Sequence, residues 1–226
     1  MVVPSKPRGK FITFEGLDGA GKSTQLKKLA AYLRLQGVDV IITREPGGTS
    51  LGSRLRAVLL NSRTAGLSPM AELALMFADR AQDIDEKILP ALQRGQWVLC
   101  DRFSDSSEAY QGGGRQLGSQ AVHELHKILC HGLKPDLTIL MLSDLSASIA
   151  RARRRNTAKS KKKKDENRFE KEKEAFHQRV MDVYLAIAKR EPQRIVKVDA
   201  RDPIPEVHRR IVQSVEERLM KKGVSR

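Results

Sequence analysis

Residues 16–23 read GLDGAGKS, a glycine-rich loop that ends in a lysine and a serine. Glycines allow the backbone to approach an anion closely, and the N–H groups of such a loop point at phosphate oxygens. The pattern G-x-x-x-x-G-K-[ST] predicts a nucleoside triphosphate site, in which Lys22 reaches the β- and γ-phosphates and Ser23 ligates Mg²⁺. The expected nucleotide-binding residues are Gly16, Leu17, Asp18, Gly19, Ala20, Gly21, Lys22, Ser23 and Thr24.

Asp18 lies inside this loop, where a carboxylate repels a triphosphate unless it serves a second ligand or a metal. The alternative is an aspartate that stabilises the loop by accepting hydrogen bonds from backbone N–H groups. We favour the second ligand. The sequence contains no N-K-x-D-like guanine loop, which argues against a GTPase.

Two further segments present an arginine directly after an expected strand. TREPGGTSLGSRLRAVLL follows the strand 38–43 and contains Arg44, and DRFSDSSEAYQGGG ends the strand 96–101 and contains Arg102. The carboxyl ends of parallel strands form one ligand-binding edge, where two guanidinium groups could hold a phosphate monoester. Each arginine alone could equally be a surface or salt-bridge residue. Asp101 ends its apolar strand and is the expected second Mg²⁺ partner.

The elements that must position these residues alternate along the chain. Short apolar, β-branched runs predict five strands, and periodic apolar residues predict helices between them, with Pro90 and Gly95 near one helix end. This alternation predicts an α/β domain with a parallel sheet covered on both faces. The expected strands are 10–16, 38–43, 96–101, 135–142 and 194–199, and the expected helices include 22–37, 50–61, 69–93 and about 203–222.

Composition narrows the class of protein. The net charge of +15 indicates anionic partners, but the 4% aromatic content lacks the stacking platforms of single-strand nucleic-acid binders. The chain shows neither an 18-residue apolar run nor a leader pattern, so we expect a cytoplasmic protein without membrane association. Cys100 and Cys130 have no metal-ligand spacing and are expected to be buried and reduced.

Five motifs together resemble the thymidylate kinase family: FEGLDGAGKST, TREPGGTSLGSRLR, FADRAQ, DRFSDSSEAYQG and NRFE. The resemblance covers roughly residues 10–210. It implies a P-loop NTPase-type five-stranded parallel sheet, a mobile lid at about 150–170 and usually a homodimer. It also implies transfer of the γ-phosphoryl group of ATP to thymidine 5′-monophosphate with Mg²⁺. We expect one kinase domain over 10–222, preceded by a flexible arm at 1–9.

The resemblance also implies roles for individual residues. Asp18 would hold the sugar 3′-hydroxyl, and Arg44 and Arg102 the acceptor phosphate. Tyr110 would pack under the deoxyribose, although a helix aromatic in the core is an alternative. The remaining implied substrate contacts are Arg80 to a thymine carbonyl, Ser106 and Ser107 to the far edge of the base, and Glu170 from the lid.

One position departs from the family pattern. The family usually places a phenylalanine four residues before the base-reading arginine, to stack on the thymine. Here that place is Met76, and Phe77 follows it. A shift of one residue rotates a helical side chain by about 100°. Either Met76 covers the base through its polarizable sulfur, or the helix shifts so that Phe77 does, which leaves base selectivity open.

The basic segment 151–170 reads RARRRNTAKSKKKKDENRFE. Thymidylate kinases carry a transfer-stabilising arginine either in the phosphate loop, where this chain has Gly19, or in the lid. The chain therefore resembles the bacterial type. Arg155 and Arg168 are the expected lid arginines, and they complete a catalytic set of Asp18, Lys22, Arg102, Arg155 and Arg168. The run Lys161–Lys164 is either a solvated insertion or an electrostatic attractant for ATP or nucleic acid.

Two alternatives stay open on the sequence alone. The departure at Met76 is compatible with a kinase of another nucleoside monophosphate. The charge of +15 is compatible with a nucleic-acid-binding P-loop ATPase, although the chain has no recognisable nucleic-acid module and that function leaves the acceptor motifs unexplained.

Overall fold

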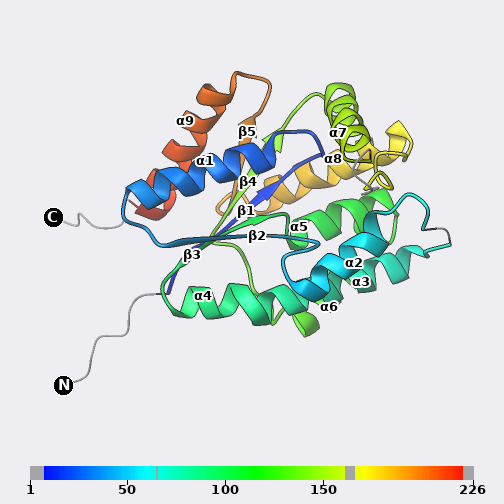
Figure 1. The fold of residues 1–226 in the computed structure, drawn as a ribbon, viewed down its shortest axis with the longest axis horizontal. Helices are drawn as coiled ribbons and strands as arrows, with labels where there is room; N and C mark the ends of the chain where they lie inside the picture. Colours follow the sequence, from blue (N-terminus) through cyan, green and yellow to red (C-terminus); the bar gives the residue numbers. More distant parts are fainter. Residues whose placement is uncertain (1–7, 65, 161–165, 221–226) are drawn as a thin grey trace.

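The computed structural model describes residues 8–64, 66–160 and 166–220. Its five-stranded sheet has the order β2-β3-β1-β4-β5, and all neighbouring strands are parallel, as Figure 1 shows. The strands are β1 (Phe11–Glu15), β2 (Val40–Arg44), β3 (Trp97–Asp101), β4 (Leu137–Leu142) and β5 (Ile195–Asp199). The sheet confirms the expected parallel α/β architecture, and each strand lies within two residues of its expected bounds.

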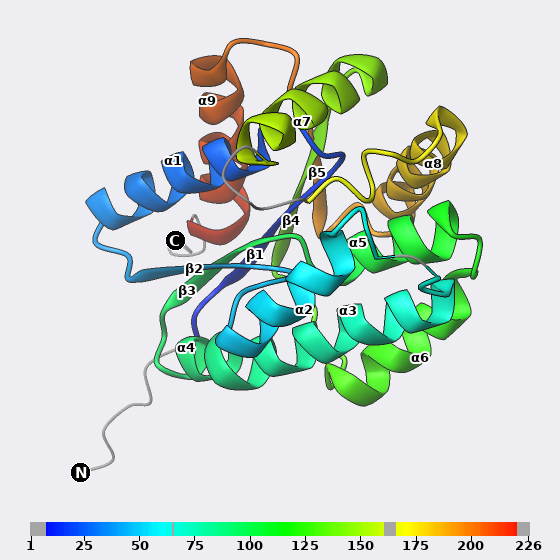
Figure 2. The same cartoon turned by 45° about the vertical axis from the view of Figure 1, so that its right-hand side comes forward.

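Helices connect the strands and cover both faces of the sheet (Figure 2). They are α1 (Lys22–Leu35), α2 (Ser50–Leu60), α3 (Pro69–Asp83), the π-helical turn η1 (Ile84–Ile88), α4 (Leu89–Gln93), α5 (Ser104–Ser107), the π-helical segment η2 (Glu108–Gly114), α6 (Ser119–Leu129), α7 (Leu145–Ser160), α8 (Glu174–Arg190), α9 (Ile204–Val215) and the π-helical turn η3 (Glu216–Met220). No helix in the described ranges is long and apolar enough to cross a bilayer.

The expected helix 69–93 runs past Pro90 and ends at Gln93 before Gly95. Proline is tolerated there because Pro90 lies in the first turn of α4, after η1, where a backbone N–H has no helical partner. At the other end of the chain, the sequence places Gly9 in the flexible arm. Gly9 is buried instead and donates its N–H to the carbonyl of Leu92 at 2.9 Å, while residues 1–7 lie outside the described part.

The central strand β1 sends alternate side chains to opposite faces of the sheet. Ile12 and Phe14 pack in the cluster formed with α1 and α9. Phe11 packs with α3, α4 and α6 on the opposite face. Thr13 and Glu15 share the face of Phe11, so the last residue of the strand directs a carboxyl into the protein beneath the ligand-binding edge.

Helix α7 rests on the glycine loop that joins β1 to α1 (Figures 1 and 2). Gly19 has a φ of +83°, and a Cβ built on it would lie 2.2 Å from the carbonyl oxygen of Ser148. Ser148 and Ala152 are both fully buried by this contact layer. Nε of Arg151 donates to the carbonyl of Gly19 at 2.9 Å. Only glycine allows the loop and the helix to approach this closely.

Gly19→Ala tests this packing, and Gly37→Ala is its matched control. Gly37 also has a positive φ, +77°, but a Cβ added to it would meet nothing within 4 Å. Both substitutions incur left-handed strain of about 1–2 kcal/mol. Gly19→Ala also forces α7 away from the loop, so we expect its free energy of unfolding in urea to fall by roughly a further 1–3 kcal/mol. Equal losses for the two variants would show that α7 does not depend on this contact.

Candidate active site

A large cavity opens over the glycine loop at the carboxyl ends of β1, β2 and β3. Its lining contains six cationic residues: Lys22, Lys27, Arg44, Arg56, Arg102 and Arg151. Residues of the glycine loop and three carboxylates lie among these cations: Gly19, Gly21, Ser23, Thr24, Asp18, Glu45 and Asp101. Positive charge, loop N–H groups and the start of α1 converge there, which suits a polyphosphate.

Lys22 is folded onto its own loop. Its Nζ donates to the carbonyls of Gly16 and Leu17 at 3.0 and 2.8 Å. Burial, followed by the repulsion of Arg102, lowers the pKa of Lys22 to about 8. An anion held in the loop would favour the charged ammonium and raise this pKa again.

Ser23 and Asp101, the two expected metal partners, line the same cavity and contact each other. Oγ of Ser23 donates to Oδ2 of Asp101 at 2.5 Å, across 78 residues of sequence. A hydroxyl and a carboxylate are hard oxygen donors of the kind that Mg²⁺ prefers. The donor set therefore fits the expected ion.

A second cavity adjoins the first and encloses roughly 630 Å³, including its opening to solvent. Its lining contains all but two of the expected substrate-binding residues. The two cavities share Asp18, Glu45, Arg56 and Arg102. The second cavity is lined by Asp18, Glu45, Pro46, Arg56, Leu60, Met76, Arg80, Arg102, Ser106, Ser107, Tyr110, Gln111, Glu166, Phe169 and Glu170.

Arg102 stands at the junction of the two cavities. Its Nη2 lies 3.1 Å from Oδ1 of Asp18 and donates to Oη of Tyr110 at 3.1 Å. Its guanidinium carbon lies 4.9 Å from the centre of the Tyr110 ring. The residue adopts a φ of +76°, a left-handed conformation that costs a non-glycine residue about 1–2 kcal/mol. The surrounding contacts hold Arg102 in this strained conformation, which aims its side chain at the junction.

Arg80 projects from α3 into the second cavity. Its Nε lies 2.6 Å from Oε2 of Glu45, and its Nη2 donates to the carbonyl of Phe103 at 3.1 Å. Its Nη1 is buried and has no hydrogen-bond partner among the described residues. A buried donor of this kind is costly unless a ligand satisfies it, and a base carbonyl would do so.

The structure separates the roles of Met76 and Phe77. Met76 lines the second cavity, whereas Phe77 is fully buried in the core beside α4 and α6. The guanidinium carbon of Arg80 lies 4.7 Å from the centre of the Phe77 ring. Phe77 therefore supports Arg80 from the core and does not face the cavity as a base-stacking residue would. The other expected substrate residue outside this cavity, Arg44, lines the first one.

The lid arginines do not all reach the cavities. Nη2 of Arg168 lies 2.7 Å from Oε2 of Glu72, a fully buried carboxylate of α3, and its Nε donates to the carbonyl of Leu59. Arg168 is thus engaged in an ion pair with α3 in this structure and not at the expected transferring phosphate. The side chain of Arg155 lies outside the described residues. Among the α7 arginines whose side chains the structure describes, Arg151 lines the first cavity.

A pair of oppositely charged side chains closes one wall of the second cavity. Nε and Nη2 of Arg56 donate to the two carboxylate oxygens of Glu166 at 2.8 and 3.2 Å, and Nη1 donates to the carbonyl of Pro46 at 2.8 Å. Sequence reasoning missed both residues. The only available signal was their position in the motif TREPGGTSLGSRLR and in the basic segment 151–170, because the two partners are 110 residues apart.

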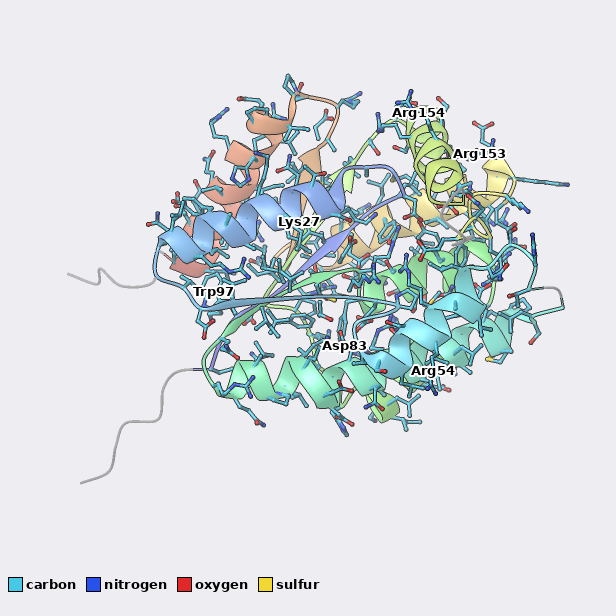
Figure 3. All side chains as sticks on the ribbon, in the orientation of Figure 1. Lys27, Arg54, Asp83, Trp97, Arg153 and Arg154 are labelled. Atoms are coloured by element: carbon cyan, nitrogen blue, oxygen red, sulfur yellow. The ribbon has the colours of Figure 1, made fainter. Side chains whose placement is uncertain are left out.

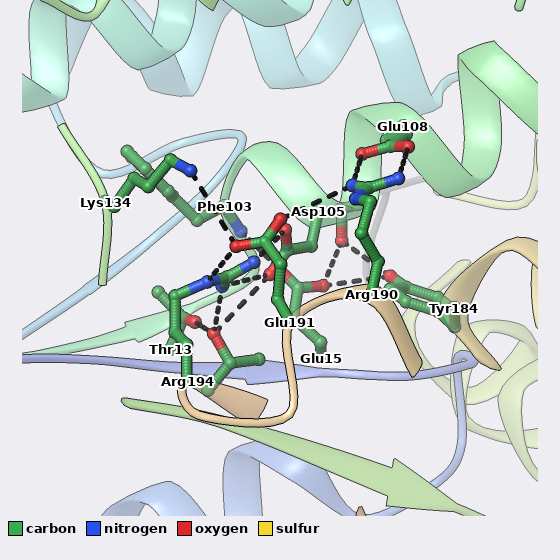
Figure 4. Close-up of polar contacts among 12 residues, drawn as sticks. Thr13, Glu15, Phe103, Asp105, Glu108, Lys134, Tyr184, Arg190, Glu191 and Arg194 are labelled. Carbon is green, nitrogen blue, oxygen red and sulfur yellow. Dashed lines mark hydrogen bonds and ion pairs between the residues drawn. The ribbon is translucent and has the colours of Figure 1, made fainter. Parts of the chain in front are cut away.

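Glu15 and Tyr184, which Figure 4 shows in contact, were also missed, and Tyr184 accepts a hydrogen bond from Nη1 of Arg102 at 3.1 Å. Oε2 of Glu15 accepts from Oη of Tyr184 at 2.9 Å and from Oγ of Ser106 at 2.5 Å. The expected role of Ser106 was contact with the far edge of the base. It lines the cavity, but its hydroxyl is engaged with Glu15 and Arg102. The signal for Glu15 was an ionisable residue at the end of an otherwise apolar strand.

Comparison with known proteins agrees with this geometry. The family model described as thymidylate kinase matches residues 14–211. Thymidylate kinases of Alkalilimnicola ehrlichii and Desulfovibrio desulfuricans are 48% and 46% identical over 200 and 213 residues, which cover 88% and 94% of this chain and 89% and 98% of the relatives. The crystal structure of thymidylate kinase from Ehrlichia chaffeensis matches with a TM-score of 0.74 at 32% identity, over 93% of this chain and all of that one. The chain belongs to the thymidylate kinase family.

Proposed function

We propose that this chain transfers the γ-phosphoryl group of ATP to thymidine 5′-monophosphate, giving ADP and thymidine 5′-diphosphate. The observation that carries the proposal is the junction of two cavities at Arg102. One cavity has the loop and cations of a triphosphate site. The other is smaller, has an apolar and aromatic wall, and ends at the same guanidinium, so a donor and an acceptor phosphate can meet there.

Positioning and charge stabilisation account for the transfer. Lys22 and the loop N–H groups hold the β- and γ-phosphates of ATP, and Arg44 and Arg102 hold the acceptor phosphate. Arg102 then also faces the charge that develops between the two substrates. Ser23 and Asp101 would hold Mg²⁺, which supplies further charge neutralisation when bound. Asp18 contacts Arg102 from the loop and receives the sugar 3′-hydroxyl.

The wall of the second cavity selects the nucleoside. Met76 covers one face of the base, and Arg80 donates to a base carbonyl through the nitrogen that has no protein partner among the described residues. Tyr110 is 5% exposed, and its ring packs edge-on against Phe169 with centroids 5.4 Å apart. A ring fixed in this way forms a rigid floor for the deoxyribose and disfavours a 2′-hydroxyl.

A kinase of another nucleoside monophosphate is the second candidate, and Met76 is the observation that favours it. A thioether in place of an aromatic ring covers a base with less shape selectivity, because the methionine side chain is flexible.

A homodimer and a cytoplasmic location complete the proposal, as the family resemblance implies. Support for the dimer comes from apolar side chains exposed on two adjoining helices, Leu51 and Val58 on α2 and Met70 on α3, which are 44%, 45% and 51% exposed. A second copy would cover them.

The acceptor preference of the enzyme tests the proposed function. In a coupled assay of ADP formation, we expect kcat/KM to be highest for dTMP and lower by about 10-fold or more for dUMP, which lacks one methyl group. The enzyme with ATP and no acceptor is the control for simple hydrolysis. A higher kcat/KM for dCMP, dUMP or dGMP would reject thymidine as the acceptor nucleoside.

Arg151→Ala tests the lid arginine that lines the triphosphate cavity. We expect kcat/KM for ATP to fall about 10- to 100-fold, because a charge-assisted contact to phosphate is lost. Arg154→Ala is the matched control, since Arg154 is an exposed arginine on the same helix, labelled in Figure 3, that lines neither cavity. Its kcat/KM is expected to stay within about threefold of wild type. Equal effects of the two substitutions would indicate that only the overall charge of α7 matters.

A further inference from the structure

Glu15 is a buried carboxyl that lines neither substrate cavity. It is fully buried at the end of β1. It accepts three hydrogen bonds: from the N–H of Phe103 at 2.7 Å, from Oγ of Ser106 at 2.5 Å and from Oη of Tyr184 at 2.9 Å. These donors belong to the loop after β3, to α5 and to α8, so one side chain ties three separate segments to the central strand (Figure 4).

Arg102 lies on the other side of the same two hydroxyl groups. Its Nη1 donates to Oγ of Ser106 at 3.0 Å and to Oη of Tyr184 at 3.1 Å. Each hydroxyl has a single proton and two lone pairs. An ionised Glu15 can only accept, so it draws the hydroxyl protons to its own side. The oxygen lone pairs of Ser106 and Tyr184 then face the guanidinium.

A protonated Glu15 would reverse part of this arrangement. Its own O–H would have to donate to one of the two hydroxyls, because the N–H of Phe103 already occupies the other carboxyl oxygen. The proton of that hydroxyl would then turn away from Glu15. That hydroxyl can then donate to the other one across the 2.8 Å contact between Ser106 and Tyr184, and the other can still donate to a lone pair of the protonated oxygen. Both hydroxyls keep a lone pair toward Arg102, but the neutral acid no longer attracts the guanidinium as an opposite charge.

We propose that Glu15 is a positioning residue for phosphoryl transfer: its ionised carboxylate attracts the guanidinium of Arg102 and accepts the hydroxyl protons of Ser106 and Tyr184, which then accept from Arg102 and fix it at the acceptor phosphate. The inference rests on the proposed function. It adds a contact behind the substrate arginine that is itself out of reach of either substrate.

The charges around Glu15 place its ionisation in the working pH range. Burial, followed by the repulsion of Asp105, raises the pKa of Glu15 to about 7, and Arg102 opposes the rise. Nη1 and Nη2 of Arg194 donate to the two oxygens of Asp105 at 2.7 and 3.0 Å and compensate its charge. The charged or titratable groups that face or influence Glu15 are Asp105 and Arg102 after β3, Cys100 on β3, Lys22 on α1, Tyr184 on α8 and, through Asp105, Arg194 before β5.

The test is the pH dependence of steady-state kinetics for wild type and Glu15→Gln between about pH 5.5 and 9. If the ionised form is the active one, wild-type kcat/KM for dTMP falls as the pH drops through about 7, and this fall is the acidic limb of the pH profile. Glutamine keeps the shape but carries no charge, and its amide nitrogen donates to the two hydroxyls at every pH. We expect its kcat/KM for dTMP to be about 10- to 100-fold lower at pH 8, its KM for ATP to stay within about threefold, and its acidic limb near pH 7 to disappear.

Two substitutions near Glu15 serve as controls, because they leave Glu15 in place and are expected to shift the pH profile in opposite directions. Asp105→Asn removes the repelling charge, so the acidic limb should move to lower pH while activity at pH 8 is retained. Arg194→Gln removes the cation that compensates Asp105, so the limb should move to higher pH. If Glu15, Asp105 and Arg194 had a purely structural role, the two substitutions would change the level of activity or the melting temperature. They would not shift the acidic limb of the pH profile to lower pH in one variant and to higher pH in the other.

The outcomes separate the two proposals. A wild-type enzyme without dTMP kinase activity rejects the proposed function itself. An active wild type with an unchanged Glu15→Gln profile overturns the inference. Circular dichroism melting shows whether Glu15→Gln folds. If Glu15→Gln does not fold, the pH profiles of Asp105→Asn and Arg194→Gln test the inference in its place. The inference is overturned if kcat/KM for dTMP falls at the same pH in both variants as in wild type.

Discussion

The guanidinium of Arg102 is the charge on which the arrangement of this site depends. Its side chain is 14% exposed, and a cation this deep needs compensating partners that do not move. Asp18 supplies the opposite charge from the glycine loop, while Tyr110 and Tyr184 accept hydrogen bonds from its nitrogens. These partners come from separate elements around the carboxyl edge of the sheet. Fixing one arginine therefore also fixes the distance between the two cavities.

The glycine loop serves a second purpose besides holding phosphate. Gly19 forms the surface on which Ser148 of α7 rests, and Arg151 is anchored to its carbonyl. A side chain at this loop position would occupy the space of the helix backbone. The absence of an arginine from the loop and the presence of one on α7 are thus two consequences of the same close contact. Arg151 reaches the first cavity from α7 because this helix lies where a loop side chain would be.

The sequence predicted the features that depend on local pattern. The strands, the phosphate loop and the arginines at strand ends follow from periodicity and from the parallel sheet. Helical phase alone could not decide between Met76 and Phe77, because the answer depends on which face of α3 packs on the core. Arg168 was assigned by its chain position, whereas its partner Glu72 lies on a distant helix. Glu15 was overlooked because its partners are 88, 91 and 169 residues away.

The protonation state of Glu15 that stabilises the folded chain is the opposite of the one that we propose for activity. A carboxyl whose pKa is raised from 4.5 to about 7 on folding favours the folded chain in its protonated form. That contribution is fully present below pH 4.5 and is lost as the pH rises through about 7. The attraction between Glu15 and Arg102 requires the opposite, ionised form. The three hydrogen bonds to Glu15 and the nearby charge of Arg102 lower the cost of ionisation, and the pKa stays near neutrality because Asp105 and burial oppose them. Replacing Glu15 by a neutral residue would remove that cost, but it would also remove the charge that attracts Arg102 and the acceptor that holds both hydroxyl protons away from it.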